Sequence, residues 1–366
     1  MKIKAVVFSA LLGMITGFVF YGCTSTPENI TPAVNSWQVL GGAGFSPGEA
    51  DHIDMTFNNS SLFVVFSDKN NSNKLTVMYY SNSMWNVLGD ANFSGSYAQL
   101  TSIKVIQDRV YVAFRDSMAG GIAQVKVYDN SEWTNVGTAI SSTFINGLKM
   151  DVKNGLPIVA YVEGMAGEVS VKQYTNDTWN LVGSAAFANT GSAGLVLEVN
   201  NGIPYIVIGD AAQNYKLTVM YYSNAAWNTL GNAGFSASNA YDMNLVFNGN
   251  TPCVVYRDLK YQTKLTVKYY SNSQWNILGT EGFTDASYPI LAANSGNLYL
   301  LYSDPANGSK AVVKSYQNNT WGAVGNAGFS SGEVYYTSLV FLTNVAYAAY
   351  KDLGNGGKIS VLYYKP

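Results

Sequence analysis

Seven acidic residues recur along the chain at intervals of 46 to 48 residues, each at the end of a short apolar stretch such as "LFVVFSD" or "TPCVVYRD". Carboxylates gathered in one place could bind a cation or the hydroxyl groups of a carbohydrate. A suitably spaced pair could also perform the acid and base steps of glycoside hydrolysis. The seven residues are Asp68, Asp116, Glu163, Asp210, Asp258, Asp304 and Asp352.

The residue before each acid varies and is basic in three repeats, where it is Arg115, Arg257 or Lys351. These three side chains could bind an anionic group, or they could be solvated charges at the rim of the protein. Together with the seven acids they form the candidate ligand-binding rim that the sequence defines. The loops after Glu163 and Asp210 diverge most from the repeat, which either a specific site or neutral drift would produce.

A structural role for the acids competes with a binding role. In five repeats a lysine follows six residues after the acid, at the start of the next apolar stretch. That spacing places the two side chains across one hairpin loop, where they can pair or where the acid can cap turn amides. The five lysines are Lys74, Lys216, Lys264, Lys310 and Lys358.

The repeat itself predicts the elements that position these residues. The seven tryptophans are spaced by 48, 48, 46, 48, 48 and 46 residues. Residues 42–89 contain four short stretches rich in Val, Tyr and Phe, separated by Asn, Ser and Gly turns, which is typical of antiparallel strands. The tryptophans are Trp37, Trp85, Trp133, Trp179, Trp227, Trp275 and Trp321.

Four short strands in a period near 48 residues are typical of a propeller blade. Residues 36–366 resemble repeat-built propellers, so we predict an all-β fold, a seven-bladed β-propeller of four-stranded antiparallel blades. "SWQVLG" at residues 36–41 matches only a fourth strand, and "KISVLYYKP" ends after a third strand. We therefore expect the N-terminal strand to close the last blade. The seven acids would then form a ring on the face that carries the crossings between blades.

The motif "W..LG..GF" is interpreted as the outer strand, its glycine turn and the crossing to the next blade. Its phenylalanines are expected to fill the space between blades, and the third blade departs with Ser141 at this position. WD-repeat propellers use an Asp after the second strand as a structural hydrogen-bonding residue, which the acids here resemble, although no Trp is followed by Asp. The phenylalanines are Phe45, Phe93, Phe187, Phe235, Phe283 and Phe329.

The sequence offers little for known propeller enzymes. Sialidases bind the substrate carboxylate with three arginines, and the chain has only Arg109, Arg115 and Arg257. Arg109 and Arg115 lie at opposite ends of one predicted strand, about 20 Å apart at ~3.3 Å per residue. His52 is the only histidine, so neither a Ser/His/Asp triad nor a histidine metal site is expected. We predict no enzyme and no cofactor, with acid-only glycosidase or lyase chemistry as the alternative.

The inner strands of the predicted propeller carry a mixed set of polar residues. They differ in charge and lie at staggered depths, so we interpret them as a solvated channel lining and not as a site. The residues are Asp54, Lys104, Lys149, Asp151, Glu198 and Asn244.

The N-terminus predicts export. Lys2 and Lys4 precede an apolar run over residues 5–20, which is typical of a signal peptide, here residues 1–22. The run stops at Cys23 and resembles the lipobox of bacterial lipoproteins, which implies that Cys23 is diacylated and anchors the chain to a membrane. An uncleaved signal anchor is the alternative.

Residues 23–35 are rich in Thr, Pro and Asn and predict a flexible tether before the single propeller domain of residues 36–366. Phe20 and Tyr21 depart from the usual lipobox, which has Leu and a small residue there. Thr24, where an Asp would retain a lipoprotein in the inner membrane, favours the outer membrane or cell surface. With Cys23 lipidated, only Cys253 is left as a thiol.

The composition is rich in aromatic residues and poor in charge, which suits a carbohydrate-binding surface. Charged residues are 12% of the chain and the net charge is −2, so nucleic acid is not an expected partner. The 27 tyrosines suit sugar stacking, and we expect a monomeric, non-catalytic propeller that binds a glycan, with a protein-binding envelope scaffold as the alternative. Exposure of Tyr97, Tyr241, Tyr288 and Tyr335 at the rim would favour the lectin.

Overall fold

The computed structural model describes residues 35–58 and 61–366. The chain divides into two units, residues 1–34 and 35–366. The predicted signal peptide, Cys23 and all of the predicted tether except Asn35 lie outside the described residues, so these features stay predictions.

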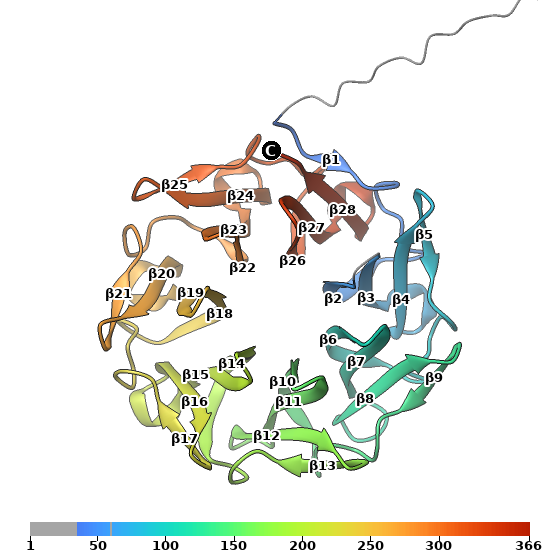
Figure 1. Cartoon of the computed structure of the whole chain (residues 1–366). Helices are drawn as coiled ribbons and strands as arrows, with labels where there is room; N and C mark the ends of the chain where they lie inside the picture. Colours follow the sequence, from blue (N-terminus) through green and yellow to red (C-terminus); the bar gives the residue numbers. More distant parts are fainter. Residues whose placement is uncertain (1–34, 59–60) are drawn as a thin grey trace, which may run out of the picture. The chain divides into compact units, whose positions relative to one another are not determined.

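Residues 35–366 fold as an all-β propeller, which confirms the predicted fold class. Five four-stranded sheets and one eight-stranded sheet, which holds two blades, give seven blades in the described region. Figure 1 shows the blades in a ring, with the first strand of each blade nearest the axis and the fourth at the outside.

The strands are short and are separated by tight turns. Blade 1 comprises β2 (Ala50–Phe57), β3 (Leu62–Asp68), β4 (Lys74–Ser81) and β5 (Met84–Val87). Blade 2 comprises β6 (Ala98–Ile106), β7 (Arg109–Asp116), β8 (Ile122–Asp129) and β9 (Glu132–Asn135). Blade 3 comprises β10 (Ile145–Lys153), β11 (Leu156–Glu163), β12 (Glu168–Thr175) and β13 (Thr178–Leu181). Blade 4 comprises β14 (Ala188–Asn200), β15 (Ile203–Asp210), β16 (Lys216–Ser223) and β17 (Ala226–Thr229). Blade 5 comprises β18 (Ala240–Asn248), β19 (Thr251–Asp258), β20 (Lys264–Ser271) and β21 (Gln274–Ile277). Blade 6 comprises β22 (Ser287–Asn294), β23 (Asn297–Asp304), β24 (Lys310–Gln317) and β25 (Thr320–Ala323). Blade 7 comprises β26 (Val334–Leu342), β27 (Val345–Asp352), β28 (Lys358–Tyr364) and β1 (Gln38–Val39). Short 3-10 turns follow five of the second strands: η1 (Lys69–Asn71), η2 (Ala211–Gln213), η3 (Leu259–Tyr261), η4 (Pro305–Asn307) and η5 (Leu353–Asn355).

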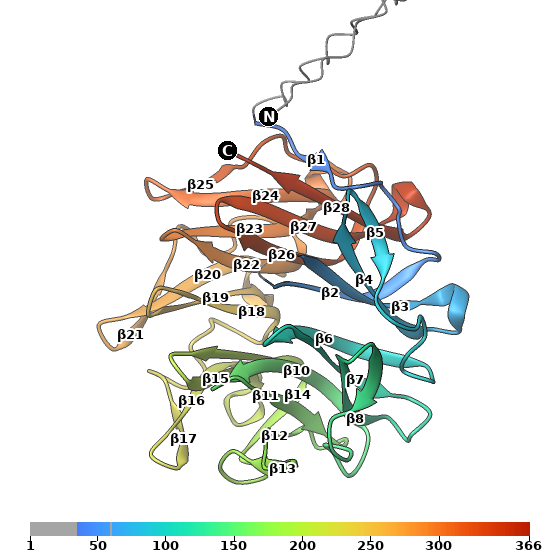
Figure 2. The same ribbon diagram turned by 45° about the vertical axis from the view of Figure 1, so that its right-hand side comes forward.

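The N-terminal strand closes the ring, as predicted. β1 pairs antiparallel with β28 through Gln38↔Tyr363 and Val39↔Leu362, so the last blade combines both ends of the propeller (Figure 2). This pairing removes an open strand edge at the seam.

Blades 3 and 4 are joined more closely than the other pairs. β14 is 13 residues long, and its first residues pair with β12 through Glu168↔Asn189 and Val169↔Ala188. The strand then becomes the inner strand of blade 4, which is why these two blades share one sheet.

The Trp, Gly and Phe of the repeat join neighbouring blades. The Trp85 indole donates a hydrogen bond to the Leu40 carbonyl at 2.9 Å, and its ring stacks on Phe45 with centroids 4.0 Å apart. Gly41 has φ +79°, and a Cβ there would lie only 3.1 Å from the Trp85 ring, so glycine is required. The other six indoles donate to the equivalent carbonyl of the preceding blade, from Trp37, Trp133, Trp179, Trp227, Trp275 and Trp321.

The third blade departs from the phenylalanine pattern at a different residue than predicted. Ile140, not Ser141, stands at the Phe position, because its amide donates to the Ala123 carbonyl at 2.9 Å in the manner of Phe235 in blade 5. Ile140 is buried against Trp179. The prediction was wrong by one position because the crossing in blade 3 is one residue shorter.

Candidate functional site

The seven acids end the second strands and accept hydrogen bonds from nearby turns. Five of them cap η1 to η5 by accepting from the amide two residues onward. Asp116 accepts from the Met118 amide at 3.1 Å, and Glu163 accepts from the Ser142 amide at 2.6 Å. Asp352, 1% exposed, also accepts from the Ser360 hydroxyl at 2.8 Å.

These contacts favour the structural interpretation of the acids. Among the described residues, no ion pair joins an acid to the lysine six residues later. Each acid therefore caps backbone amides, either in the turn that follows its strand or in the crossing that leads into its blade.

Two of the three basic rim residues are bound by their neighbours. Lys351 is 7% exposed, and its ammonium contacts Glu49 and lies 2.7 Å from the Asp51 carboxylate. Arg115 donates to the Gln99 side chain and to a backbone carbonyl. The interpretation of these side chains as solvated rim charges is therefore wrong, since each one is paired inside the fold.

The third, Arg257, positions two residues at the start of β18. Its Nη1 lies 3.0 Å from the Asp242 carboxylate, and its Nε and Nη2 donate to the Thr263 carbonyl and hydroxyl at 3.0 and 3.1 Å. Its Cζ lies 5.0 Å from the centre of the Tyr241 ring. Every guanidinium nitrogen thus has a partner, and the guanidinium lies against the Tyr241 ring.

A β-bulge interrupts the inner strand of each blade near the crossing face. In five blades a non-glycine residue there has φ between +49° and +55°. Such backbone costs bulky residues about 1–2 kcal/mol, and bulges commonly re-aim a side chain. These bulge residues are His52, Leu100, Asp242, Tyr288 and Tyr336, and blade 4 has Gly194 instead.

Several bulge side chains meet around the mouth of the central channel. The Tyr336 ring lies 5.3 Å from His52 and 5.9 Å from Tyr288, although these residues belong to blades 7, 1 and 6. Tyr288 also packs edge-on against Tyr335 at 5.4 Å. Contacts between the innermost strands of successive blades place these rings around the axis. We call His52, Tyr288, Tyr335 and Tyr336 the aromatic cluster; all four are half-buried.

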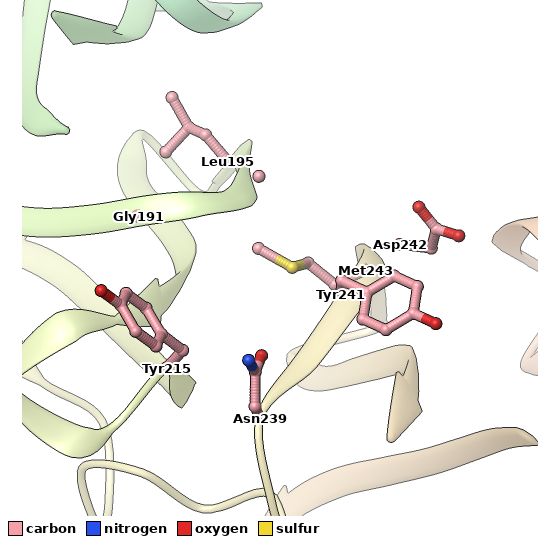
Figure 3. A pocket seen from close by; sticks show the side chains of 8 residues that line it. Gly191, Leu195, Tyr215, Asn239, Tyr241, Asp242 and Met243 are labelled. Carbon is pink, nitrogen blue, oxygen red and sulfur yellow. The ribbon is translucent and has the colours of Figure 1, made fainter. Parts of the chain in front are cut away.

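A pocket of about 570 Å³ opens between blades 4 and 5 on the same face. Figure 3 shows Tyr215 on one side of it, Tyr241, Asp242 and Met243 on the other, and Asn239 between them. Gly191, Gly194 and Leu195 complete the lining.

Tyr215 breaks the repeat in this pocket. Its amide donates to the carbonyl of the capping acid at 2.8 Å, as the amides of Asn73, Thr263 and Ser309 do in blades 1, 5 and 6. All four residues have left-handed backbone, which is unusual for a bulky aromatic residue such as Tyr215, with φ +60°. The ring lies over Gly191, where a Cβ would be 2.5 Å from the Tyr215 Cε1. The Tyr215 ring thus forms one wall of the pocket and leaves room only for a glycine at position 191.

Only one of the four tyrosines that the sequence singled out is exposed at the rim, so the exposed row of tyrosines expected for a lectin is not formed. Tyr97 is 37% exposed, whereas Tyr241, Tyr288 and Tyr335 are half-buried at the starts of the inner strands. Sequence reasoning missed Tyr215, although the alignment of "DAAQNYK" with "DKNNSNK" and "DLKYQTK" carries the signal.

The polar residues of the inner strands form a connected set. Lys104 pairs with Asp151 at 3.0 Å inside a channel of about 500 Å³. Asp54, Asp151 and Asn244 each accept a hydrogen bond from an amide of the next inner strand, at 3.0, 2.6 and 2.9 Å. The predicted channel lining is confirmed for Asp54, Lys104, Lys149, Glu198 and Asn244, whereas Asp151 is buried. Asp54, Asp151 and Asn244 also fasten neighbouring blades, and Lys149 is exposed in the channel.

Glu198 gives the channel a pH-dependent contribution to stability. Burial raises the pKa of Glu198 from 4.5 to about 7, although Lys104 and Lys149 oppose the rise. The folded state therefore binds this proton more tightly than the unfolded chain, and the resulting stability is present below pH 4.5 and lost as the pH rises through 7.

We expect Glu198→Gln to be more stable than the wild type at pH 8 by about 1–3 kcal/mol and to lose that advantage near pH 4. Urea unfolding at a series of pH values measures the difference, and Asp285→Ala, at an exposed crossing residue, is the control. A difference between Glu198→Gln and wild type that does not change with pH would contradict the assignment.

Within residues 35–58 and 61–366, no helix has the length and apolarity needed to span a bilayer. In the same region, no three His, Cys, Asp or Glu side chains gather as a metal site would require. Cys253 is a buried free thiol.

No known protein family matches this sequence, and no curated protein does. Among solved structures, a prolyl endopeptidase is similar over 89% of this chain and 51% of its own, at 13% identity and a TM-score of 0.57. The chain thus spans about half the length of that enzyme. The Aleuria aurantia lectin, described as a six-bladed propeller that recognises fucose, is similar over 77% of this chain and 98% of its own, at 15% identity and a TM-score of 0.50. These likenesses show the propeller fold.

Proposed function

We propose that this protein is a non-catalytic binding propeller whose ligand is a carbohydrate, held in the pocket between blades 4 and 5. The observation that carries the proposal is Tyr215. A strained, 42% exposed aromatic ring stands where the other blades have small or polar residues, and it faces a pocket. Strain of this kind persists at sites where the side chain serves a function.

The pocket offers the groups that recognise a sugar. The rings of Tyr215 and Tyr241 provide apolar surface for the C–H face of a pyranose, and the Asp242 carboxylate, 41% exposed, can accept hydrogen bonds from hydroxyl groups. The Asn239 amide can both donate and accept. Arg257 is held by Asp242 and Thr263 and does not line the pocket, and the described lining residues include no basic side chain for an acidic ligand.

Two further points support this proposal. The fucose-recognising lectin of Aleuria aurantia has a similar fold, which makes a carbohydrate a reasonable ligand class for this chain. The seven acids are used as caps, so the acid pair that glycosidase or lyase chemistry needs has no support in their contacts.

A protein-binding envelope scaffold is the second candidate. Apolar side chains on loops of the same face are unusually exposed, with Met118 at 79% and Met165 at 93%. Exposed apolar side chains of this kind suit a protein partner. In either case we propose that the protein is exported, lipidated at Cys23 and held as a monomer at a bacterial membrane, the outer membrane or cell surface.

The test is binding of the purified protein to an array of glycans and cell-wall polysaccharides. We expect selective binding that Tyr241→Ala weakens at least about tenfold, since that truncation removes one stacking surface. Tyr269→Ala, a half-buried tyrosine in β20, is the matched control and should bind like the wild type. If no glycan on the array bound, and a specific envelope protein were retained on the immobilised propeller, the protein-binding scaffold would be favoured instead.

A further inference from the structure

We propose that the ligand is an extended, neutral oligosaccharide that runs from the pocket between blades 4 and 5 across the channel mouth to blade 1. This proposal rests on the proposed function and adds the length and charge of the ligand. It follows from the continuity between the pocket and the aromatic cluster.

Tyr288 connects the two parts. It occupies the bulge of β22 that corresponds to Asp242, a pocket residue, in the bulge of β18. These two inner strands are neighbours, since the Leu291 amide of β22 donates to the Asn244 side chain of β18 at 2.9 Å. From Tyr288 the rings continue to Tyr336 at 5.9 Å and then to His52 at 5.3 Å. Ring contacts thus connect blades 6, 7 and 1, and the pocket that Tyr215 and Tyr241 line adjoins them at blade 5.

Backbone strain marks the same path. Tyr288 and Tyr336 have φ of +55° and +49°, and Tyr215 has φ +60°. Asparagine or glycine would occupy these positions at lower cost, as Gly194 does in blade 4. The strained tyrosines are therefore better explained by the surface they present at the mouth than by the bulge itself.

One sugar ring would leave most of this surface unused. A single pyranose can stack on one or two side chains, whereas the path offers ring faces in blades 4, 5, 6, 7 and 1. Successive sugar units on successive rings would each add contact area to one binding event. The geometry therefore points to a chain of several units.

Most of the charged side chains along the path are paired. Lys351 and Lys69 contact both Glu49 and Asp51, and Asp242 is held by Arg257. Burial also lowers the pKa of His52, with a smaller opposing effect of Asp51 and a further lowering by Arg115, so the imidazole is neutral at pH 7. The Glu333 carboxylate accepts a hydrogen bond from the Tyr335 hydroxyl at 2.9 Å and, among the described residues, makes no ion pair. Paired cations and one uncompensated carboxylate favour a neutral glycan over a uronic acid polymer.

The experiment is calorimetric titration of the full chain with neutral manno-, cello-, xylo- and chito-oligosaccharides, from the monosaccharide to the hexasaccharide. For the series that binds, we expect affinity to rise at least about tenfold between the monosaccharide and the tetrasaccharide. Tyr288→Asn and Tyr336→Asn, which keep a residue suited to left-handed backbone, should remove most of this rise and leave monosaccharide affinity unchanged.

The controls separate this proposal from the proposed function. Tyr269→Ala should keep the full dependence on length. Binding that is independent of chain length, or that is unchanged in both asparagine variants, would overturn the extended ligand while leaving a sugar pocket. Equal affinity for oligogalacturonates would overturn its neutrality, and failure of every saccharide to bind would overturn both proposals.

Discussion

Trp37→Ala is expected to lower the free energy of unfolding by about 3–5 kcal/mol, the range for truncating a buried Trp. The side chain is 7% exposed and stacks on Phe329 with centroids 4.3 Å apart. Its indole nitrogen donates to the Val324 carbonyl at 2.9 Å. β1 has only two residues, and the Leu40 and Phe45 amides add two bonds to β28 carbonyls, so this ring supplies the main apolar contact of the closing strand.

Urea unfolding with a fitted m-value measures the loss, and hydrogen exchange locates it. We expect the β28 amides to lose protection before those of the central blades. Val39→Ala, in the same strand and 47% exposed, should change stability by less than about 0.5 kcal/mol. A Trp37→Ala protein as stable as the wild type would mean that the ring closes without the N-terminal strand.

The fold could be predicted because its determinants recur in every period. Trp85 and its six counterparts each pack between two neighbouring blades, so the same residue appears seven times in the sequence at nearly constant spacing. The error at Ser141 shows the limit of this reasoning. The crossing into blade 3 is one residue shorter than the others, so counting from the Trp gives the wrong residue. The hydrogen bond from the Ile140 amide identifies the residue that packs between the blades.

The candidate site could be predicted only in part, because residues that recur in every blade serve the fold, whereas a single binding site uses residues that differ between blades. The acids attracted attention by recurring, and their contacts show that Asp258 and its counterparts recur because each turn needs a cap. The aromatic cluster depends on bulges that turn Tyr288 and Tyr336 toward neighbouring blades. A bulge does not change the residue pattern of a strand, so strand alternation alone assigns these side chains to the wrong face.

Arg257 illustrates the same limit. The sequence correctly set it apart as a break in the repeat, yet a guanidinium can either bind a ligand or hold a neighbour. Its bonds to Asp242 and Thr263 identify the second role, and this role supports Tyr241 at the pocket. Which of the two roles applies depends on the contact between Arg257 and Asp242, which lie on neighbouring strands and 15 residues apart in the chain.

Tyr215→Asn is expected to weaken glycan affinity about tenfold or more without lowering the stability of the protein. The truncation removes one wall of the pocket, and the loss of a stacking surface accounts for about 1.5 kcal/mol of binding. Asparagine tolerates the left-handed backbone at this position better than tyrosine does, and Asn73 already occupies it in blade 1. The free energy of unfolding should therefore stay within about 0.5 kcal/mol of the wild type or rise.

Calorimetry with the best glycan and urea unfolding measure the two quantities on the same samples. Tyr261→Asn, in the corresponding loop of blade 5 and outside the pocket lining, is the matched control and should keep its affinity. If Tyr215→Asn bound as tightly as the wild type, the pocket would not be the site. If it lost affinity and stability together, Tyr215 would be a packing residue. A loss of binding with unchanged or increased stability agrees with a residue whose backbone strain is maintained for its ligand.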